Sequence, residues 1–242
     1  MGDLGFDYTW YGHACVQLGT PGGRTVLIDP WFGNPKSTRR ADTVERCDLL
    51  LVTHGHGDHL GDAVALASRL HPAWPCIHEM SLWLARQLPG GSDAVIGMNK
   101  GGTVQVAGVK VTMVRAEHSA GDWNAEGGVP LYLGEPAGFV IELENGRRVY
   151  HAGDTDVFGD MRLIGELHRP DVAMLPIGGH YTMGPREAAM AVELLGVQIV
   201  VPIHYGTFPA LAGTPEELRA ALAERGLGNV QVVAPAPGQA VG

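Results

Sequence analysis

Short apolar stretches separated by glycine- and proline-containing turns predict a series of strands in the first quarter of the chain. Residues 6–11, 14–18 and 24–28 are rich in β-branched, aromatic and aliphatic side chains, and Thr20-Pro21-Gly22-Gly23 supplies a turn between two of them. The run DLLLVT at residues 48–53 has almost no polar interruption. Such a run is typical of a strand that is covered on both faces.

Helices and hairpins are expected in the middle of the chain. The spacing of apolar positions predicts a helix over residues 60–70 and a second over residues 80–88, which ends at Pro89-Gly90-Gly91. Residues 103–115 split at Ala107-Gly108 into two alternating halves, which indicates a hairpin. A second hairpin is expected where the Asn145-Gly146 step joins residues 137–143 to residues 147–151.

From residue 171 the pattern becomes an alternation of strands and helices. Strands are predicted at residues 171–177, 197–203 and 229–233, with helices at residues 185–195 and 215–225 between them. The sequence has no internal repeat and no long linker. We therefore expect one α/β domain that spans residues 1–242.

Composition and charge narrow the classes of partner. The chain has 17 Lys and Arg against 26 Asp and Glu, a formal net charge of −9, which disfavours nucleic acid as a partner. No signal peptide or bilayer-length apolar run is evident, so no membrane partner is expected. The three cysteines, Cys15, Cys47 and Cys76, share no close spacing and are expected to be reduced. These features fit a cytoplasmic protein that acts on a small molecule. They are also compatible with a homo-oligomer.

Histidine and aspartate gather directly after the apolar run at residues 48–53. The segment Thr53-His54-Gly55-His56-Gly57-Asp58-His59 places three imidazoles and a carboxylate within six residues. The two glycines allow the backbone to bend so that these side chains converge, and convergent His and Asp are what a cation such as Zn²⁺ requires. The alternative is a polar surface loop without a metal.

The pattern His-x-His-x-Asp-His resembles the signature of the metallo-β-lactamase superfamily. Three further residues fit the later motifs of that family, each at the end of a predicted strand: His118, Asp154 and His204. The narrower resemblance is to a subgroup of metal-dependent hydrolases that is similar to sugar-phosphate lactonases. It rests on Tyr11–Cys15, Asp29–Phe32, Thr182–Ala189 and His204–Pro209, whereas Gly179-His180-Tyr181 departs from the commoner relatives.

The resemblance implies a fold and a metal centre. The fold would be a four-layer αβ/βα sandwich of two mixed β-sheets flanked by helices. Two divalent metal ions, Zn²⁺ before Mn²⁺, Fe²⁺ or Ni²⁺, would be bound by seven ligands: His54, His56 and His118 for the first, Asp58, His59 and His204 for the second, and Asp154 for both. His56 stands where oxygen-handling diiron members carry Glu, which favours hydrolysis.

The expected reaction is attack by a hydroxide held between the two metals on a small ester, lactone, thioester or phosphoester. Asp58 and Asp154 are candidate catalytic residues, chiefly as ligands, and Asp29 is a candidate to orient a ligand histidine. His13 is either a substrate contact or proton carrier, or a strand-end histidine bonded to backbone. His180 is a further catalytic candidate, as a contact for an anionic group beside a helix start.

Two functions of other classes remain open at this stage. One is a metal-dependent phosphodiesterase or nuclease, for which Arg39-Arg40 and Arg147-Arg148 supply little basic surface. The other is a non-catalytic metal-binding scaffold, although no ligand position is missing. The loop at residues 123–133, directly after His118, could cover the site, but loops of this composition are more often passive.

Overall fold

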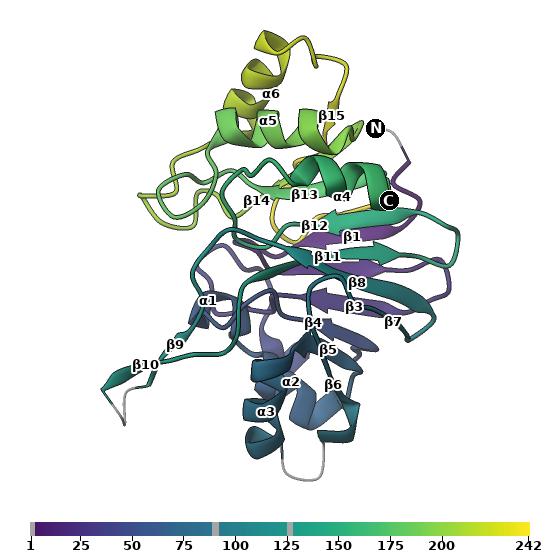
Figure 1. Ribbon diagram of the computed structural model, residues 1–242, viewed down its shortest axis with the longest axis vertical. Coiled ribbons are helices and arrows are strands. Elements are labelled where there is room, and N and C mark those ends of the chain that lie inside the picture. The colour runs from purple at the N-terminus through teal and green to yellow at the C-terminus, as the bar shows by residue number, and fades with distance from the viewer. Residues whose placement is uncertain (1–2, 89–91, 125–127) are drawn as a thin grey trace.

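The protein is built in four layers, with two β-sheets packed face to face and helices on both outer sides (Figure 1). A computed structural model describes residues 3–88, 92–124 and 128–242. The predicted four-layer αβ/βα sandwich is confirmed. None of the helices in the described residues is long and apolar enough to span a bilayer.

The first sheet collects the N-terminal strands and the C-terminal end of the chain. β1 pairs antiparallel with β2, β2 pairs antiparallel with β3, and β3 pairs parallel with β4. Its order is β16 (Ala240–Val241), β1 (Asp7–Trp10), β2 (Val16–Gly19), β3 (Thr25–Ile28) and β4 (Leu49–Leu51).

The second sheet is larger and also mixed. β12, β13, β14 and β15 run parallel to one another. β11 pairs antiparallel with β12 and with β8, and β8 pairs antiparallel with β7. Its order is β15 (Gln231–Val232), β14 (Ile199–Ile203), β13 (Val172–Pro176), β12 (Arg148–His151), β11 (Ala137–Glu142), β8 (Val109–Arg115) and β7 (Thr103–Val106).

The helices cover the outer faces of the sheets (Figure 1). α4 (Met161–His168), α5 (Pro185–Leu195) and α6 (Pro215–Glu224) lie on the second sheet. α2 (Ala63–Leu70) and α3 (His78–Gln87) lie against the first sheet, together with the parallel pair β5 (Trp74–Ile77) and β6 (Val95–Met98). The short helix α1 (Gly57–Leu60) follows β4, and two 3₁₀ turns occupy Ala41–Thr43 and Ser92–Ala94.

Alternation along the strands of the second sheet fills two separate cores. In β13, Val172 and Met174 pack into the core between the sheets, whereas Ala173 and Leu175 pack against the outer helices. Successive side chains of a strand point to opposite faces, so a strand with apolar residues at every position must be covered on both sides. This arrangement explains the uninterrupted apolar runs that predicted these strands.

The observed elements correct several details of the sequence-based prediction. The expected helix over residues 60–70 is broken, because Gly61 has a φ of 41° and separates α1 from α2. β5, β6 and α4 were not predicted. The stretch at residues 123–133 contains β10 (Val129–Leu131), which pairs with β9 (Asp122–Asn124), while residues 125–127 lie outside the described residues.

Candidate metal centre

Four of the candidate ligands lie where the first sheet ends. His54 follows β4, His56 precedes the first turn of α1, and Asp58 and His59 lie within α1. Gly55 is required there, because a Cβ at this position would lie 2.7 Å from the Cβ of Leu133. The glycine lets the backbone approach Leu133 closely, so that His54 and His56, on either side of it, can face the same point.

The other three candidate ligands follow strands of the second sheet. His118 lies after β8, Asp154 after β12 and His204 after β14. The loops of the first two are joined, because the Glu117 amide donates to Thr155 Oγ1 at 2.9 Å and the Asp156 amide donates to the Glu117 carbonyl at 2.9 Å. The ends of both sheets therefore deliver side chains to one location.

The structure brings the seven predicted ligands into overlapping groups. The ligand atoms of His54, His56 and His118 lie within 4.8 Å of one another, as do those of His54, His59 and Asp154. A third group unites Asp58, His59 and His204 with His13 under the same limit. Two of these groups contain the residues expected at the first and the second ion, with His13 added to the second, and the remaining group joins His54 and His59 to Asp154.

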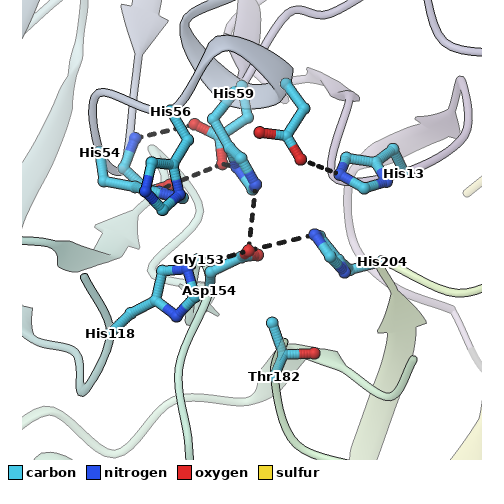
Figure 2. A network of polar contacts seen from close by, with 12 residues as sticks. His13, His54, His56, His59, His118, Gly153, Asp154, Thr182 and His204 are labelled. Carbon is cyan, nitrogen blue, oxygen red and sulfur yellow. Dashed lines mark hydrogen bonds and ion pairs between the residues drawn. The ribbon is translucent and has the colours of Figure 1, made fainter. Parts of the chain in front are cut away.

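Asp154 connects the groups. Its Oδ2 lies 3.2 Å from His59 Nε2, 3.1 Å from His204 Nε2 and 3.6 Å from His118 Nε2. Figure 2 shows the His59 ring above this carboxylate and the His204 ring to one side of it, both directed at it. One carboxylate thus faces histidines of both sites, as expected for a ligand that bridges two cations.

Several buried polar atoms at the centre lack a hydrogen-bond partner among the described residues. They are His59 Nε2, both ring nitrogens of His204, and Asp154 Oδ1. The contacts of His59 Nε2 and His204 Nε2 with Asp154 Oδ2 are short, but they do not have hydrogen-bond geometry. Unpaired polar atoms are costly in a protein interior. A cation coordinated by these atoms removes that cost, so the residues present fit a metal site with only His and Asp donors.

Burial and neighbouring charge set the protonation of the candidate ligands. Burial lowers the pKa of His54 well below its usual value and also lowers the pKa of His56 and His118. Burial opposes the ionisation of Asp154, but His204 and His59 outweigh it and hold the pKa of this carboxyl well below its usual value. Three neutral imidazoles and an ionised carboxylate are the forms that bind metal.

His59 is the exception among these histidines. Burial lowers its pKa, but the carboxylates of Asp154 and Asp29 outweigh burial and raise the pKa well above its usual value. Its Nδ1 lies 2.8 Å from Asp29 Oδ2, so this nitrogen donates to the carboxylate and Nε2 faces Asp154. Asp29 also accepts from the Thr53 amide and from Thr53 Oγ1, both at 2.8 Å. Asp29 therefore orients a ligand histidine, as predicted.

His13 is buried beside the second group. Its Nε2 lies 2.9 Å from Asp58 Oδ2 and its Nδ1 lies 3.1 Å from Thr207 Oγ1. Burial lowers the pKa of His13 to about 4, so the ring is neutral at pH 7. A neutral ring satisfies both contacts when Nε2–H donates to Asp58 and Nδ1 accepts from Thr207. Thr207 was not predicted, although it lies in the His204–Pro209 motif.

Three buried residues of the centre have left-handed backbone conformations. The φ angles of His13, Asp29 and His204 are 53°, 47° and 55°. L-residues rarely adopt such angles, and non-glycine examples concentrate at functional sites. The His204 amide donates to the His13 carbonyl at 2.8 Å, which ties the two strained positions together. Strain is tolerated here because the surrounding contacts fix each residue.

A cavity of about 340 Å³ opens onto the cluster. Its lining consists of His56, Asp58, His118, Ser119, Asp154, Tyr181 and His204. His180 is not in this lining; its side chain is exposed and its ring lies 4.3 Å from that of Tyr181. A larger recess of about 410 Å³ elsewhere includes Lys110, Glu142 and Arg148, whose charges already pair with one another.

Comparison with known proteins finds a matching family profile and similar metal-dependent hydrolases. The profile of the β-lactamase superfamily domain matches residues 24–205. The chain is similar to the UPF0173 metal-dependent hydrolase of Koribacter versatilis, with 49% identity over 215 residues, 88% of this chain and 90% of the relative. The corresponding protein of Archaeoglobus fulgidus is 49% identical over 232 residues, 96% of each chain.

A solved structure extends the similarity to three dimensions. The metallo hydrolase Igni18 of the archaeon Ignicoccus hospitalis superposes with a TM-score of 0.84 and 36% sequence identity, covering 98% of this chain and 97% of that one. The residues that match the profile, 24–205, include all seven candidate ligands.

Proposed function

Because the chain belongs to the metallo-β-lactamase superfamily, we propose that it is a metal-dependent hydrolase with a centre for two divalent ions. The observation that carries this proposal is Asp154, whose Oδ2 lies within 3.6 Å of histidines from both ligand groups. His54, His56 and His118 would hold one ion, Asp58, His59 and His204 the other, with Asp154 shared. Zn²⁺ is proposed first because the donors are imidazoles and carboxylates that lie close together within each group.

When bound, such ions supply a nucleophile by lowering the pKa of water towards neutrality, and they polarise the bond to be cleaved. The protein supplies orientation. Asp29 fixes the ring of His59, and His13 fixes the carboxylate of Asp58. Because His13 is fully buried, we assign it a positioning role through Asp58 and not a direct contact with substrate.

We propose a small ester, lactone, thioester or phosphoester as the substrate class. The cavity volume of about 340 Å³ accommodates a small molecule. The three buried cysteines are all free, which supports a reducing compartment such as the cytoplasm. The oxygen chemistry of diiron members of the superfamily is not proposed, since His56 stands where the resemblance places their Glu.

The surface gives no support to a nuclease. Arg40 pairs with Asp42, Arg148 with Glu142, and Arg147 with Asp171. Arginines whose charge is compensated in this way do not form the basic groove that a polyanion requires. A metal-binding scaffold without activity is equally unsupported, because all seven ligand positions carry His or Asp and five of these residues line a cavity.

The test is an activity screen with metal analysis on the same sample. The purified protein, loaded with Zn²⁺, would be assayed on carboxyl esters, thioesters, lactones and bis(4-nitrophenyl) phosphate. We expect close to two ions per chain and hydrolysis that a chelator abolishes. A protein that holds two ions but cleaves none of these bonds would refute the proposed function.

A further inference from the structure

Three aromatic side chains lie near the centre, one in the cavity lining and two against the ring of His13, and none of them is needed as a ligand. They are Trp31, Tyr181 and Phe208, here called the aromatic rim. Tyr181 is 61% exposed and Phe208 is 41% exposed, while Trp31 is partly buried. Large apolar side chains gathered beside a cavity are unusual on a free surface and are typical of ligand sites.

The aromatic rim adjoins the second ligand group. Tyr181 lines the cavity itself. The rings of Trp31 and Phe208 lie 6.1 Å apart, and each meets the ring of His13 edge-on, at 5.2 Å and 6.0 Å. The His13 ring in turn lies 3.9 Å from that of His204, which lines the cavity (Figure 2).

The same cavity lacks a group to bind an anion other than the metals. No Lys or Arg is in its lining within the described residues. Lys36, whose Nζ lies near Gly206, is not part of the lining. Phosphate and carboxylate groups are normally held by Arg, Lys or clustered backbone amides. The absence of Lys and Arg from the described lining disfavours a substrate with a charged group away from the reacting bond.

We infer that the substrate is an uncharged carboxyl ester, thioester or lactone with an apolar chain or ring, and that the aromatic rim binds this apolar part. The inference rests on the proposed hydrolase function and deepens it. Trp31, Tyr181 and Phe208 are specificity-determining residues, because they offer apolar contact area next to the ligands without touching the metal positions.

The test compares substrates that differ only in the group facing the rim. Phenyl acetate, phenyl hexanoate and phenyl phosphate would be assayed with the metal-loaded protein. We expect kcat/KM to be at least about tenfold higher for the hexanoate than for the acetate, since added methylenes gain apolar burial. Phenyl phosphate should be the poorest substrate. A preference for acetate or for phosphate would overturn the inference.

Variants show whether the aromatic rim causes the preference. Phe208→Ala and Tyr181→Ala should each reduce the hexanoate-to-acetate ratio of kcat/KM, mainly by raising KM for the hexanoate. Leu82→Ala removes an equally exposed apolar side chain on α3 and is the matched control. The control should retain the ratio of the unmodified protein. An unchanged ratio in both rim variants would refute the assignment of these residues.

A binding measurement separates this inference from the proposed function. Hexanohydroxamate and acetohydroxamate would be titrated calorimetrically into the metal-loaded protein and into Phe208→Ala. We expect about tenfold tighter binding of the longer compound, and loss of that difference in the variant. If no ester is cleaved, the proposed function fails while this titration still decides whether the rim selects apolar chains. Equal affinities would overturn the inference.

Discussion

At the scale of the residue, the centre depends on carboxylates that each serve more than one partner. Asp154 faces three histidines, and Asp29 accepts from Thr53 and His59. Both carboxylates are buried, so their charge acts in a medium of low polarity. Replacing either one therefore alters several contacts at once, although the side-chain size hardly changes.

Asp154→Asn should lower turnover by several orders of magnitude and release at least one metal ion. The substitution removes a negative charge that faces both ligand groups while it preserves shape. Turnover and elemental analysis on the same preparation would check this result. His168→Asn, at a half-buried histidine at the end of α4, is the control and should retain metal and activity. Similar behaviour of the two variants would contradict the ligand assignment.

Asp29→Asn should weaken metal binding, although it leaves every candidate ligand residue in place. Oδ1 of Asp29 accepts from the Thr53 amide, and Oδ2 accepts from Thr53 Oγ1 and His59 Nδ1. An amide nitrogen in place of Oδ2 loses the hydrogen bond to His59, and one in place of Oδ1 loses the bond that holds the side chain to Thr53, so the His59 ring is less well fixed in either case. Loss of such an orienting partner typically reduces metal affinity by about 10- to 100-fold. Competition with a chromogenic chelator would measure it. Asp42→Asn, at an exposed ion pair with Arg40, serves as control. Unchanged affinity would mean that Asp29 does not orient His59.

The residues that converge at the centre could be named from the sequence because they belong to one short motif or follow predicted strands, and the resemblance to a family supplied their assignment to two ions. Asp29 also follows a predicted strand, and it contacts His59. It did not reveal Thr207, which lies 194 positions from the ring of His13 that it contacts. The aromatic rim was missed for a similar reason. Trp31 and Phe208 meet only through folding, and a single exposed aromatic residue carries no signal of its own.

At the scale of the element, α4 shows how tertiary packing overrides local preference. Gly165 lies in the middle of this helix, where glycine costs about 1 kcal/mol relative to alanine. A Cβ at this position would lie 2.5 Å from the Leu195 carbonyl oxygen at the end of α5. The glycine permits the two helices to approach closely, and the same glycine weakened the helical pattern in the sequence, so α4 was not predicted.

Gly165→Ala should therefore destabilise the protein, although alanine is the better helix former. Overpacking against backbone typically costs about 1–3 kcal/mol, which urea unfolding would measure. Gly159→Ala, just before α4, is the matched control, because nothing lies within 4 Å of the added Cβ. The control should be neutral or slightly stabilising. A stabilising effect of Gly165→Ala would show that α4 and α5 can separate freely.

Strands were easier to predict than the helix boundaries, and the reason is physical. The strands of the second sheet are apolar on both faces because a sheet and a helix layer cover them. α5 was also predicted with its observed bounds, since Pro185 begins it and Gly196 ends it with a φ of 69°. The break at Gly61 depends on close approach to the Trp31 backbone, which no local pattern encodes.

At the scale of the whole molecule, the interior contains histidines that resist protonation. His151 is fully buried on β12, and its Nδ1 accepts from the Gly153 amide at 3.2 Å. Burial lowers its pKa from 6.5 to about 4. Between these values the unfolded chain binds a proton that the folded protein excludes, so stability falls as the pH falls through this window.

We expect the metal-free protein to lose about 3 kcal/mol between pH 7 and pH 4 through His151 alone. Urea unfolding after chelation, at pH 7, 6 and 5, would measure the trend. The C2 proton of His151 followed by NMR would isolate this residue, with its shift unchanged down to about pH 5. Titration of His151 near pH 6.5, or stability that does not vary with pH, would contradict the prediction.

The metal centre draws its ligands from the ends of both sheets, with His54, His56, Asp58 and His59 on one side and His118, Asp154 and His204 on the other. Bound ions would therefore link the two sheets, and the sheets could not separate before the ions dissociate. A ligand that binds only the folded state stabilises it in proportion to the logarithm of its free concentration. The lifetime of this protein in a cell would then depend on the supply of metal. In a cell short of metal, the metal-free protein would be degraded.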